Sequence, residues 1–371
     1  MKKSSHLEVL VSPLRSRRAL LGLVGVLLVA ACSVGASSQT ASSAMPSASP
    51  GTPSGASPSA APSAVGEPVK LVVGLGYIPS VQFAPFYLAQ QEGWYTAAGL
   101  EVEFQNKIDP DLITLVGQGA IDVGIGDGTS VIPAVSQGIP VRYIATIYGQ
   151  FPNVVFAKAA SGISTAADLE GRRIGTPGRY GSGWIMLQAL LGSAGLTPED
   201  VEIVEYPDFT QRAAVEQGAV DAATGFANNE PVQLELAGEP AVLLRIDDIT
   251  PLPGPGLISG TSTLESKRAA IEAFVATTLR AMDVITTDPE LGLEAAIVAV
   301  PELATARDAQ LTVLEATIES WSGPAQTAGG LGAIDQTGWA ESIEFLTSLG
   351  LVPNPVTVDD LVETGSSRGD Y

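Results

Sequence analysis

Histidine and cysteine are almost absent from this sequence. Among its 371 residues there is one histidine, His6, and one cysteine, Cys32. The chain beyond Cys32 therefore cannot form a Ser-His-Asp triad, a Cys-His pair, a histidine-ligated metal site or an internal disulfide. We expect no metal site and no cofactor. A secreted hydrolase that uses a pair of carboxylates remains open, because the chain holds 40 Asp and Glu residues.

Positive charge is scarce as well. The chain has 19 Lys and Arg residues against 40 Asp and Glu, which gives a formal net charge of -21. Residues 1–31 hold five of the basic residues and one acid, so the rest of the chain is more acidic still. Such a surface repels the phosphates of nucleic acids and of anionic lipids, which excludes nucleic acid as a partner.

The first 32 residues have the pattern of a secretory signal. Basic residues precede an apolar run, Ala19–Val29, which is followed by Ala30-Ala31-Cys32. The run is short for a membrane span, whereas a basic head, an apolar stretch and small residues before a cleavage point are typical of a signal peptide. The last four residues also resemble the lipobox of bacterial lipoproteins, in which the cysteine is acylated. A plain signal peptide with a chance cysteine is the alternative. We expect residues 1–32 to be a lipoprotein signal and Cys32 to anchor the protein at the extracytoplasmic face of the cell membrane.

Residues 33–68 have the composition of a tether. Between Ser33 and Glu67, 28 of 35 residues are Ser, Ala, Pro or Gly. A segment with so little apolar bulk does not offset its ordering entropy, so we expect disorder. A flexible coil of this length reaches roughly 30 Å, which suits a domain held away from a membrane. A linker without function is the alternative.

From Val69 onward the chain alternates between strand and helix patterns. Apolar runs typical of strands lie at 69–75, 100–104, 120–126, 141–147, 172–176, 201–206, 219–226 and 241–246. Helical periodicity is found at 85–92, 112–118, 130–137, 184–194, 210–217, 264–287, 290–300, 304–320 and 337–349. This succession predicts α/β layers with sheets rich in parallel strands. The folded part, to about Glu363, is too long for one average core and natural for two lobes.

Two segments of the chain echo each other. GQGAIDVGIG at 117–126 and EQGAVDAATG at 216–225 both place Gln-Gly-Ala between an expected helix and an expected strand. Two lobes built alike would produce this echo, and so would two unrelated helix-to-strand turns.

Aromatic residues make up 6% of the chain, yet six of them fall in GYIPSVQFAPFYLAQQEGWY at 76–95. Within this stretch, Tyr77-Ile78-Pro79 and Gln82–Ala89 resemble the substrate-binding proteins of ABC importers. The resemblance is to the branch that takes up thiamine-pyrimidine precursors, riboflavin and sulfonates such as taurine. Further matching segments follow in the same order at 93–95, 99–102, 117–126, 168–175 and 229–231, so that the resemblance covers roughly residues 70–300.

The resemblance implies a type II periplasmic-binding-protein fold, α/β, with a ligand cleft between two lobes that close by hinge motion. Lobe one would comprise 69–155 plus 257–365, and lobe two 156–256. The implied protein is a monomer without enzymatic activity, and its partners are a small-molecule ligand and an ABC permease.

In such lobes the loops after the strands line the cleft, which gives the predicted ligand-binding residues. They are Tyr77, Gln82, Phe83, Asp127, Tyr180, Gly181, Ser182, Asn228, Asn229 and Glu230. The rings of Tyr77 and Phe83 would stack on a flat ligand, or Tyr77 would stand at a strand end and Phe83 in the core. Gln82 and Asp127 would contact the ligand or cap the helices that follow them.

Two further loops have the same double interpretation. The glycine-rich loop 178–183 would offer backbone N–H groups to an acceptor or anion on the ligand, or would be an ordinary turn. Asn228–Glu230 would bond the ligand, or would start a helix at Pro231. Trp184 is a weaker candidate, and we expect the other rings of 76–95 to pack within the lobe.

The opening Gly76-Tyr77-Ile78-Pro79-Ser80 indicates which branch is nearest. The pyrimidine-precursor members show an Asp-Trp-x-Pro-Asn-type opening with a nearby histidine, and this sequence looks more like the riboflavin-binding members. Arg179 is the single cation in a predicted site loop, which argues against a sulfonate. The related eukaryotic pyrimidine synthases donate an active-site histidine, which the mature chain lacks. The resemblance therefore implies a flavin ligand, with a pyrimidine or a sulfonate as alternatives.

Overall fold

The computed structural model describes residues 67–106 and 111–363. The predicted signal peptide, Cys32 and nearly all of the predicted tether lie outside the described residues. The strands are β1 (Val69–Gly74), β2 (Leu100–Gln105), β3 (Val123–Gly126), β4 (Val141–Thr146), β5 (Asn153–Lys158), β6 (Arg173–Thr176), β7 (Glu202–Glu205), β8 (Ala222–Phe226), β9 (Ala241–Arg245) and β10 (Gly256–Gly260).

Helices connect and cover these strands. They are α1 (Ala84–Gln91), α2 (Trp94–Ala97), α3 (Leu112–Gly117), α4 (Gly128–Ser136), α5 (Gly181–Ser193), α6 (Gln211–Glu216), α7 (Glu230–Leu236), α8 (Thr261–Thr287), α9 (Pro289–Ala299), α10 (Arg307–Ser320), α11 (Pro324–Gly329), α12 (Gln336–Ser348) and α13 (Val358–Leu361). None of the helices in the described ranges is both long enough and apolar enough to cross a membrane.

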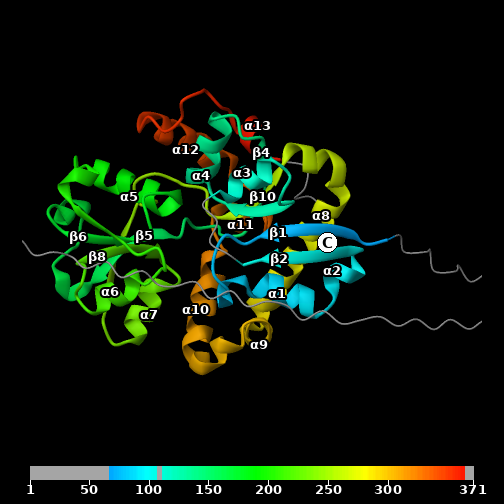
Figure 1. Ribbon diagram of the computed structural model, residues 1–371, viewed down its shortest axis with the longest axis horizontal. Helices are drawn as coiled ribbons and strands as arrows, with labels where there is room; N and C mark the ends of the chain where they lie inside the picture. The colour runs from blue at the N-terminus through cyan, green and yellow to red at the C-terminus, as the bar shows by residue number, and fades with distance from the viewer. Residues whose placement is uncertain (1–66, 107–110, 364–371) are drawn as a thin grey trace, which may run out of the picture. The chain divides into compact units, whose positions relative to one another are not determined.

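The strands form two five-stranded sheets of the same design (Figure 1). The first sheet has the order β2-β1-β3-β10-β4 and the second the order β7-β6-β8-β5-β9. In each sheet, four strands run in the same direction, and the remaining strand, β10 or β5, is antiparallel to both of its neighbours. We call the residues around the first sheet the first lobe and those around the second sheet the second lobe. The predicted α/β layering is present, but the sequence pattern did not reveal the two antiparallel strands.

The antiparallel strands explain where the chain passes between lobes. Strand β4 belongs to the first sheet and β5, the next strand along the chain, belongs to the second. The chain therefore first crosses between the lobes at 147–152. The return lies at 246–255, before β10 rejoins the first sheet. The lobe boundary that we expected between residues 155 and 156 therefore falls inside β5, because apolar runs reveal strands but not the sheet that they join.

The two echoing segments occupy equivalent places in the two sheets. Asp122, before β3, accepts a hydrogen bond on Oδ2 from the backbone N of Val72 at 2.9 Å. Asp221, before β8, accepts one from the backbone N of Arg173 at the same distance. Each aspartate thus fastens the start of a strand to its parallel neighbour and also pairs with a cation, Lys267 at 2.8 Å or Arg173 at 3.0 Å. The echo reflects two lobes built alike.

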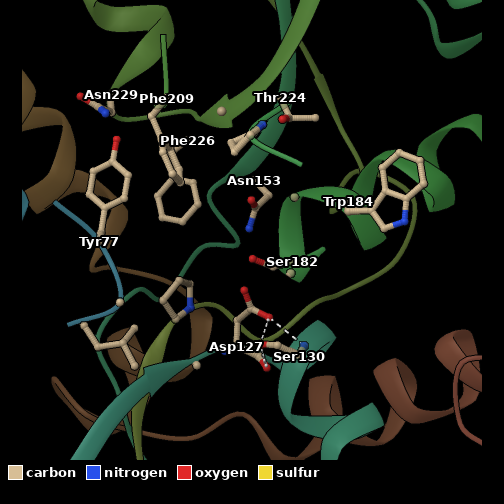
Figure 2. A pocket seen from close by; sticks show the side chains of 18 of the residues that line it. Tyr77, Asp127, Ser130, Asn153, Ser182, Trp184, Phe209, Thr224, Phe226 and Asn229 are labelled. Carbon is tan, nitrogen blue, oxygen red and sulfur yellow. Dashed lines mark hydrogen bonds between the residues drawn. The ribbon is translucent and has the colours of Figure 1, made fainter. Parts of the chain in front are cut away.

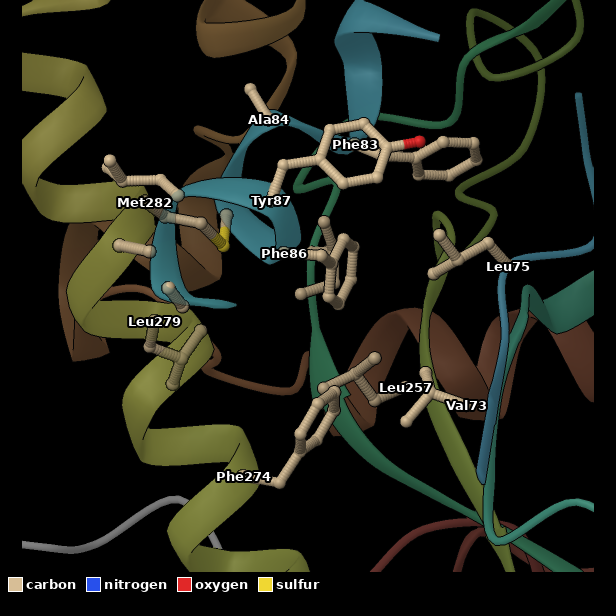
Figure 3. Close-up of a cluster of buried hydrophobic side chains, with 14 of the residues drawn as sticks. Val73, Leu75, Phe83, Ala84, Phe86, Tyr87, Leu257, Phe274, Leu279 and Met282 are labelled. Atoms are coloured by element: carbon tan, nitrogen blue, oxygen red, sulfur yellow. The ribbon is translucent and has the colours of Figure 1, made fainter. Parts of the chain in front are cut away.

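Most of the rings of 76–95 that we expected to pack lie in the core of the first lobe (Figure 3). Phe86 stacks on Phe274 with ring centroids 6.3 Å apart, and Tyr95 stacks on the same ring at 5.1 Å. The Tyr95 hydroxyl is satisfied by Thr278 Oγ1 at 2.8 Å. Helix α8 therefore holds α1 and α2 against the first sheet through aromatic contacts that bury large apolar surfaces.

The helices after β10 also link the lobes. Helix α10 packs against α7 of the second lobe and against the 3-10 turn Val81–Phe83 of the first. Helix α5 of the second lobe packs against α4 of the first. The loops at the carboxyl ends of the two sets of parallel strands consequently face each other.

We predict that Phe274→Ala lowers the free energy of unfolding by about 3–5 kcal/mol, because it removes a fully buried ring that two other rings contact. Chemical denaturation measures the change. Val298→Ala in α9 is the matched control, since its side chain is 62% exposed, and a change within about 0.5 kcal/mol is expected there. Equal effects of the two substitutions would contradict the packing.

Candidate functional site

A cavity with a volume of about 310 Å³ lies between the two sheets. Its walls are the loops after β1, β3, β6, β7 and β8, together with the start of β5. The carboxyl ends of parallel strands are the usual place for ligand sites in α/β folds, and the volume is at the lower end of the range for small-molecule sites.

Nine of the ten predicted site residues line this cavity. Those nine are Tyr77, Gln82, Phe83, Asp127, Tyr180, Gly181, Ser182, Asn229 and Glu230. Asn228 is not part of the lining; it is buried behind Gln82. The weaker candidate Trp184 does line the cavity, whereas Arg179 lies outside the lining. The structure thus brings together loops that are separated by about 150 residues in the sequence.

Aromatic side chains dominate the walls. Seven line the cavity: Tyr77, Phe83, Tyr148, Tyr180, Trp184, Phe209 and Phe226. Tyr77 of the first lobe meets Phe209 of the second edge to face, with ring centroids 5.0 Å apart (Figure 2). Burial raises the pKa of the Tyr77 hydroxyl, and the nearby Glu230 carboxylate adds to the effect, so this tyrosine stays neutral at physiological pH. The walls can enclose a flat ring system.

Phe209 reaches the cavity through an unusual backbone conformation. Its φ is 59°, and within the described residues no other residue except glycine has a positive φ. A left-handed conformation costs a residue with a Cβ roughly 1–2 kcal/mol. Such strain is concentrated at functional sites, and here it turns an aromatic ring toward Tyr77.

Asp127 is buried at the start of α4 and caps that helix. Its Oδ1 accepts a hydrogen bond from Thr129 Oγ1 at 2.7 Å. The same oxygen accepts hydrogen bonds from Ser130 Oγ at 2.9 Å and Ser130 N at 3.1 Å (Figure 2). Burial raises the pKa of this carboxyl group, while the Thr129, Ser130 and Ser182 side chains act in the opposite direction. Of its two predicted roles, the structural one, helix capping, is present.

Glu230 also lines the cavity and has a partner within the protein. Its Oε2 accepts a hydrogen bond from the backbone N of Phe226 at 2.8 Å. Burial raises the pKa of the carboxyl group, against the hydrogen bond from Phe226 and the charge of Arg212. The helix start that we expected at Asn229–Pro231 is present as the first turn of α7.

Gln82 and Asn228 bond to each other across the lobes instead of facing the cavity with free amides. Asn228 Nδ2 donates to Gln82 Oε1 at 3.1 Å and to Thr317 Oγ1 at 2.8 Å. Tyr148 OH donates to the same Gln82 oxygen at 3.4 Å, and Gln82 Nε2 donates to Ser80 Oγ at 3.2 Å. We call Gln82, Asn228, Tyr148 and Thr317 the inter-lobe network. Both the nitrogen and the oxygen of the Gln82 amide thus have partners within the protein.

Two polar groups of the cavity lining have no hydrogen-bond partner among the described residues, and the sequence pattern did not indicate them. In the described part of the chain, Asn153 Nδ2 and Gln211 Oε1 are buried, lack any hydrogen-bond partner and belong to residues that line the cavity. Asn153 is 3% exposed and Gln211 1% exposed. A donor and an acceptor buried without partners are costly unless a ligand satisfies them. Asn153 is the first residue of β5, a strand that the sequence pattern did not predict, and Gln211 is the first residue of α6. A polar residue at the start of a strand or helix was the one feature of the sequence that could have indicated these two site residues.

The lining residues that the structure describes carry no positive charge. Among the described lining residues there are two acids, Asp127 and Glu230, and no Lys, Arg or His. Arg179 pairs instead with Glu205 at 3.3 Å and lies over the Trp184 ring. No group of three metal-ligating side chains is found in residues 67–106 and 111–363.

Two substitutions of Phe209 separate its ring from its strain. We predict that Phe209→Gly is more stable than Phe209→Ala by about 1 kcal/mol, because glycine adopts the left-handed conformation without penalty. Both remove the ring that meets Tyr77, so both are expected to bind ligand more weakly than the wild type. Thermal unfolding and ligand titration measure the two effects, and an alanine variant as stable as the glycine variant would contradict the strain.

We predict that Asn228→Ala lowers the free energy of unfolding by about 1–3 kcal/mol, because it leaves buried partners of the inter-lobe network unsatisfied. Gln90→Ala is the control: it removes the hydrogen bond from Gln90 Nε2 to Val102 O, 3.1 Å long, at an exposed position. Denaturation curves compare the two variants. A loss no greater for Asn228→Ala than for Gln90→Ala would speak against the network.

Comparisons with known proteins agree with this architecture. A family model described as NMT1/THI5 like matches residues 80–291. The chain is 31% identical over 342 residues to riboflavin-binding protein RibY of Chloroflexus aurantiacus, covering 91% of this chain and 94% of that protein. It is 29% identical over 238 residues to 4-amino-5-hydroxymethyl-2-methylpyrimidine phosphate synthase of Legionella pneumophila, covering 62% of this chain and 74% of that protein.

Solved structures give the fold. The alkanesulfonate-binding protein SsuA from Xanthomonas axonopodis pv. citri, bound to MOPS, matches with a TM-score of 0.61 and 19% identity, covering 80% of this chain and 99% of that chain. A Candida albicans protein with the generic periplasmic-binding-protein fold matches with a TM-score of 0.58 and 17% identity, covering 79% and 96%. The predicted fold class is confirmed. On these matches, the chain belongs to the NMT1/THI5-like family and has the α/β periplasmic-binding-protein fold.

Proposed function

We propose that this protein is the solute-binding component of an ABC importer, and that it captures a planar heterocycle, riboflavin first, for delivery to a membrane permease. The observation that carries the proposal is the cavity between the lobes, with seven aromatic side chains, an unpartnered donor and an unpartnered acceptor. The similarity to a riboflavin-binding protein over most of both chains supports the same ligand. In this proposal the protein acts as a monomer, anchored through Cys32 outside the cytoplasm.

The lining suits the chemistry of an isoalloxazine ring. Its apolar faces would stack on aromatic side chains of the lining, such as Tyr77 of the first lobe or Phe226 of the second. Its pyrimidine edge carries carbonyl acceptors on either side of an N–H donor. The Asn153 amide can donate to a carbonyl, and the Gln211 oxygen can accept from the N–H. Each buried group would then gain the partner that the protein does not supply.

The start of α5 offers a further contact. This helix begins at Gly181 with no side-chain cap, so its first N–H groups lack intrahelical partners. Gly181 and Ser182 line the cavity, and we propose that they bond an acceptor on the ligand.

A binding role explains the two acids better than hydrolysis does. Asp127 caps α4 and Glu230 holds the backbone of Phe226. Both carboxylates are thus engaged in shaping the walls. The lining aromatic rings come from both lobes and share the cavity with these acids, whereas a pair of catalytic carboxylates would need to face a substrate directly.

A thiamine-precursor pyrimidine is the second ligand to consider. The 29% identity to a 4-amino-5-hydroxymethyl-2-methylpyrimidine phosphate synthase favours it, and Glu230 could accept from its amino group. A sulfonate is disfavoured because the described lining offers no cation to its charge.

We predict that the purified protein quenches riboflavin fluorescence on titration. Tyr77→Ala and Asn153→Ala should each weaken binding about tenfold or more, which corresponds to about 1.4 kcal/mol for a lost stacking face or amide contact. Gln91→Ala is a matched control, because Gln91 is exposed on α1 outside the cavity.

Two outcomes would redirect the proposal. Absence of both quenching and a thermal shift with riboflavin would remove the flavin, and a thermal shift with the free pyrimidine in its place would favour the second ligand. Equal weakening by Gln91→Ala and Asn153→Ala would reject the cavity as the binding place.

A further inference from the structure

The cavity has a one-sided charge distribution that bears on which flavin it can hold. Both ionisable acids of the described lining, Asp127 and Glu230, are buried, at 4% and 7% exposure. They come from different lobes, so any ligand that fills the space between the lobes comes close to both. The described lining residues include no cation that could balance an added negative charge.

The arginines near the cavity are already paired. Arg179, next to the glycine-rich loop, pairs with Glu205 at 3.3 Å. Arg212, whose charge acts on Glu230, pairs with Glu216 at 2.6 Å. Neither side chain belongs to the lining. Recruiting either one to a phosphate would break an existing ion pair.

We propose that the cavity selects the uncharged, dephosphorylated flavin, and that Asp127 and Glu230 are specificity-determining residues that exclude FMN and FAD. This inference rests on the proposed function. It goes further by assigning to the two acids a role against competing ligands, in addition to their contacts within the protein. Proteins often discriminate between two ligands that share a ring system by a repulsive element of this kind.

The physical reason is the weak screening inside the cavity. Hydrogen bonds from Ser130 to Asp127 and from the Phe226 backbone to Glu230 favour the ionised carboxylates against the burial that raises their pKa values. A phosphate placed among these carboxylates and the aromatic walls loses its hydration and meets like charge, and no cation among the described lining residues compensates it. Riboflavin carries the same ring and a ribityl chain of neutral hydroxyls, which avoids both effects. If the protein takes up flavin released as nucleotides, a phosphate-ester hydrolysis must therefore precede capture.

The test compares three ligands by fluorescence titration of the purified full-length protein. They are riboflavin, FMN and an uncharged 5′-O-acetyl ester of riboflavin, which adds bulk at the position of the phosphate without charge. We expect FMN to bind about a hundredfold more weakly than riboflavin, and the acetyl ester to bind within about threefold of it.

Isosteric variants locate the discrimination. Asp127→Asn and Glu230→Gln keep the size and an acceptor oxygen at each position, and each should lower the ratio of the FMN and riboflavin dissociation constants by about tenfold. Glu92→Gln removes the same charge from an exposed position outside the cavity and should leave the ratio unchanged. Because the measured quantity is a ratio, a general loss of affinity in a variant does not affect it, and thermal unfolding confirms that each variant is folded.

The outcomes separate this inference from the proposed function. Tight riboflavin binding together with equally tight FMN binding would overturn the inference and leave the proposed function standing. Rejection of the acetyl ester as strong as that of FMN would show that size, not charge, discriminates. A ratio unchanged in both acid variants would overturn the role of Asp127 and Glu230. Failure of riboflavin to bind at all would overturn the proposed flavin function, and this inference with it.

Discussion

The cavity depends on a small set of buried hydrogen bonds that hold the two lobes together. Gln82 from the first lobe accepts from Asn228 of the second, and Asn228 also donates to Thr317 of α10. Because these groups are buried, breaking them would leave polar atoms without partners, which is expensive in a low-dielectric interior. The inter-lobe network thus fixes the separation of the loops that carry Tyr77, Phe209 and Phe226. Because the distance between these loops is fixed, loops from the two sheets enclose a single cavity.

Against that satisfied network, the unsatisfied groups of the cavity stand out. Most buried polar atoms in proteins have partners, as do both amide atoms of Gln82 and Nδ2 of Asn228, although Asn228 Oδ1 has none. Asn153 Nδ2 and Gln211 Oε1 do not, although they lie in the same molecule at similar burial. Asn228 Oδ1, Trp321 Nε1 and Ser342 Oγ also lack partners in the described part of the chain, but only Asn153 and Gln211 belong to residues that line the cavity. The strained backbone of Phe209 also belongs to the cavity. The evident result of this strain is that the Phe209 ring lies against Tyr77.

The two lobes have the same construction, so equivalent loops of both lobes form the site. The side chains on these loops differ between the lobes. Both sheets use the same strand order, and both use an aspartate before the third strand of the order to fasten a parallel neighbour. The loops after equivalent strands then meet face to face. Their side chains differ, with Tyr77 and Asp127 on one side and Phe209 and Glu230 on the other. Two copies of one scaffold therefore enclose a space in which each half supplies both a ring and an acid.

The sequence by itself determined the α/β class, the number of lobes, the positions of most helices and strands, and the loops that would line a site. It could do so because apolar periodicity and glycine-containing turns are local properties of the chain. Tyr77 and Glu230 were accessible in this way, since Tyr77 closely follows a recognisable strand and Glu230 lies in a recognisable helix start.

Only the tertiary structure decided which strands pair and which polar groups remain free. The antiparallel strands β5 and β10 escaped notice because an apolar run does not encode its partner strand or its direction. Asn153 and Gln211 were missed for the same reason. Gln82, expected to contact the ligand or cap a helix, lines the cavity and bonds to Asn228, 146 residues away, a partner that no local pattern indicates. Whether a side-chain amide is satisfied depends on atoms that arrive from distant segments, and that information exists only once the chain has folded.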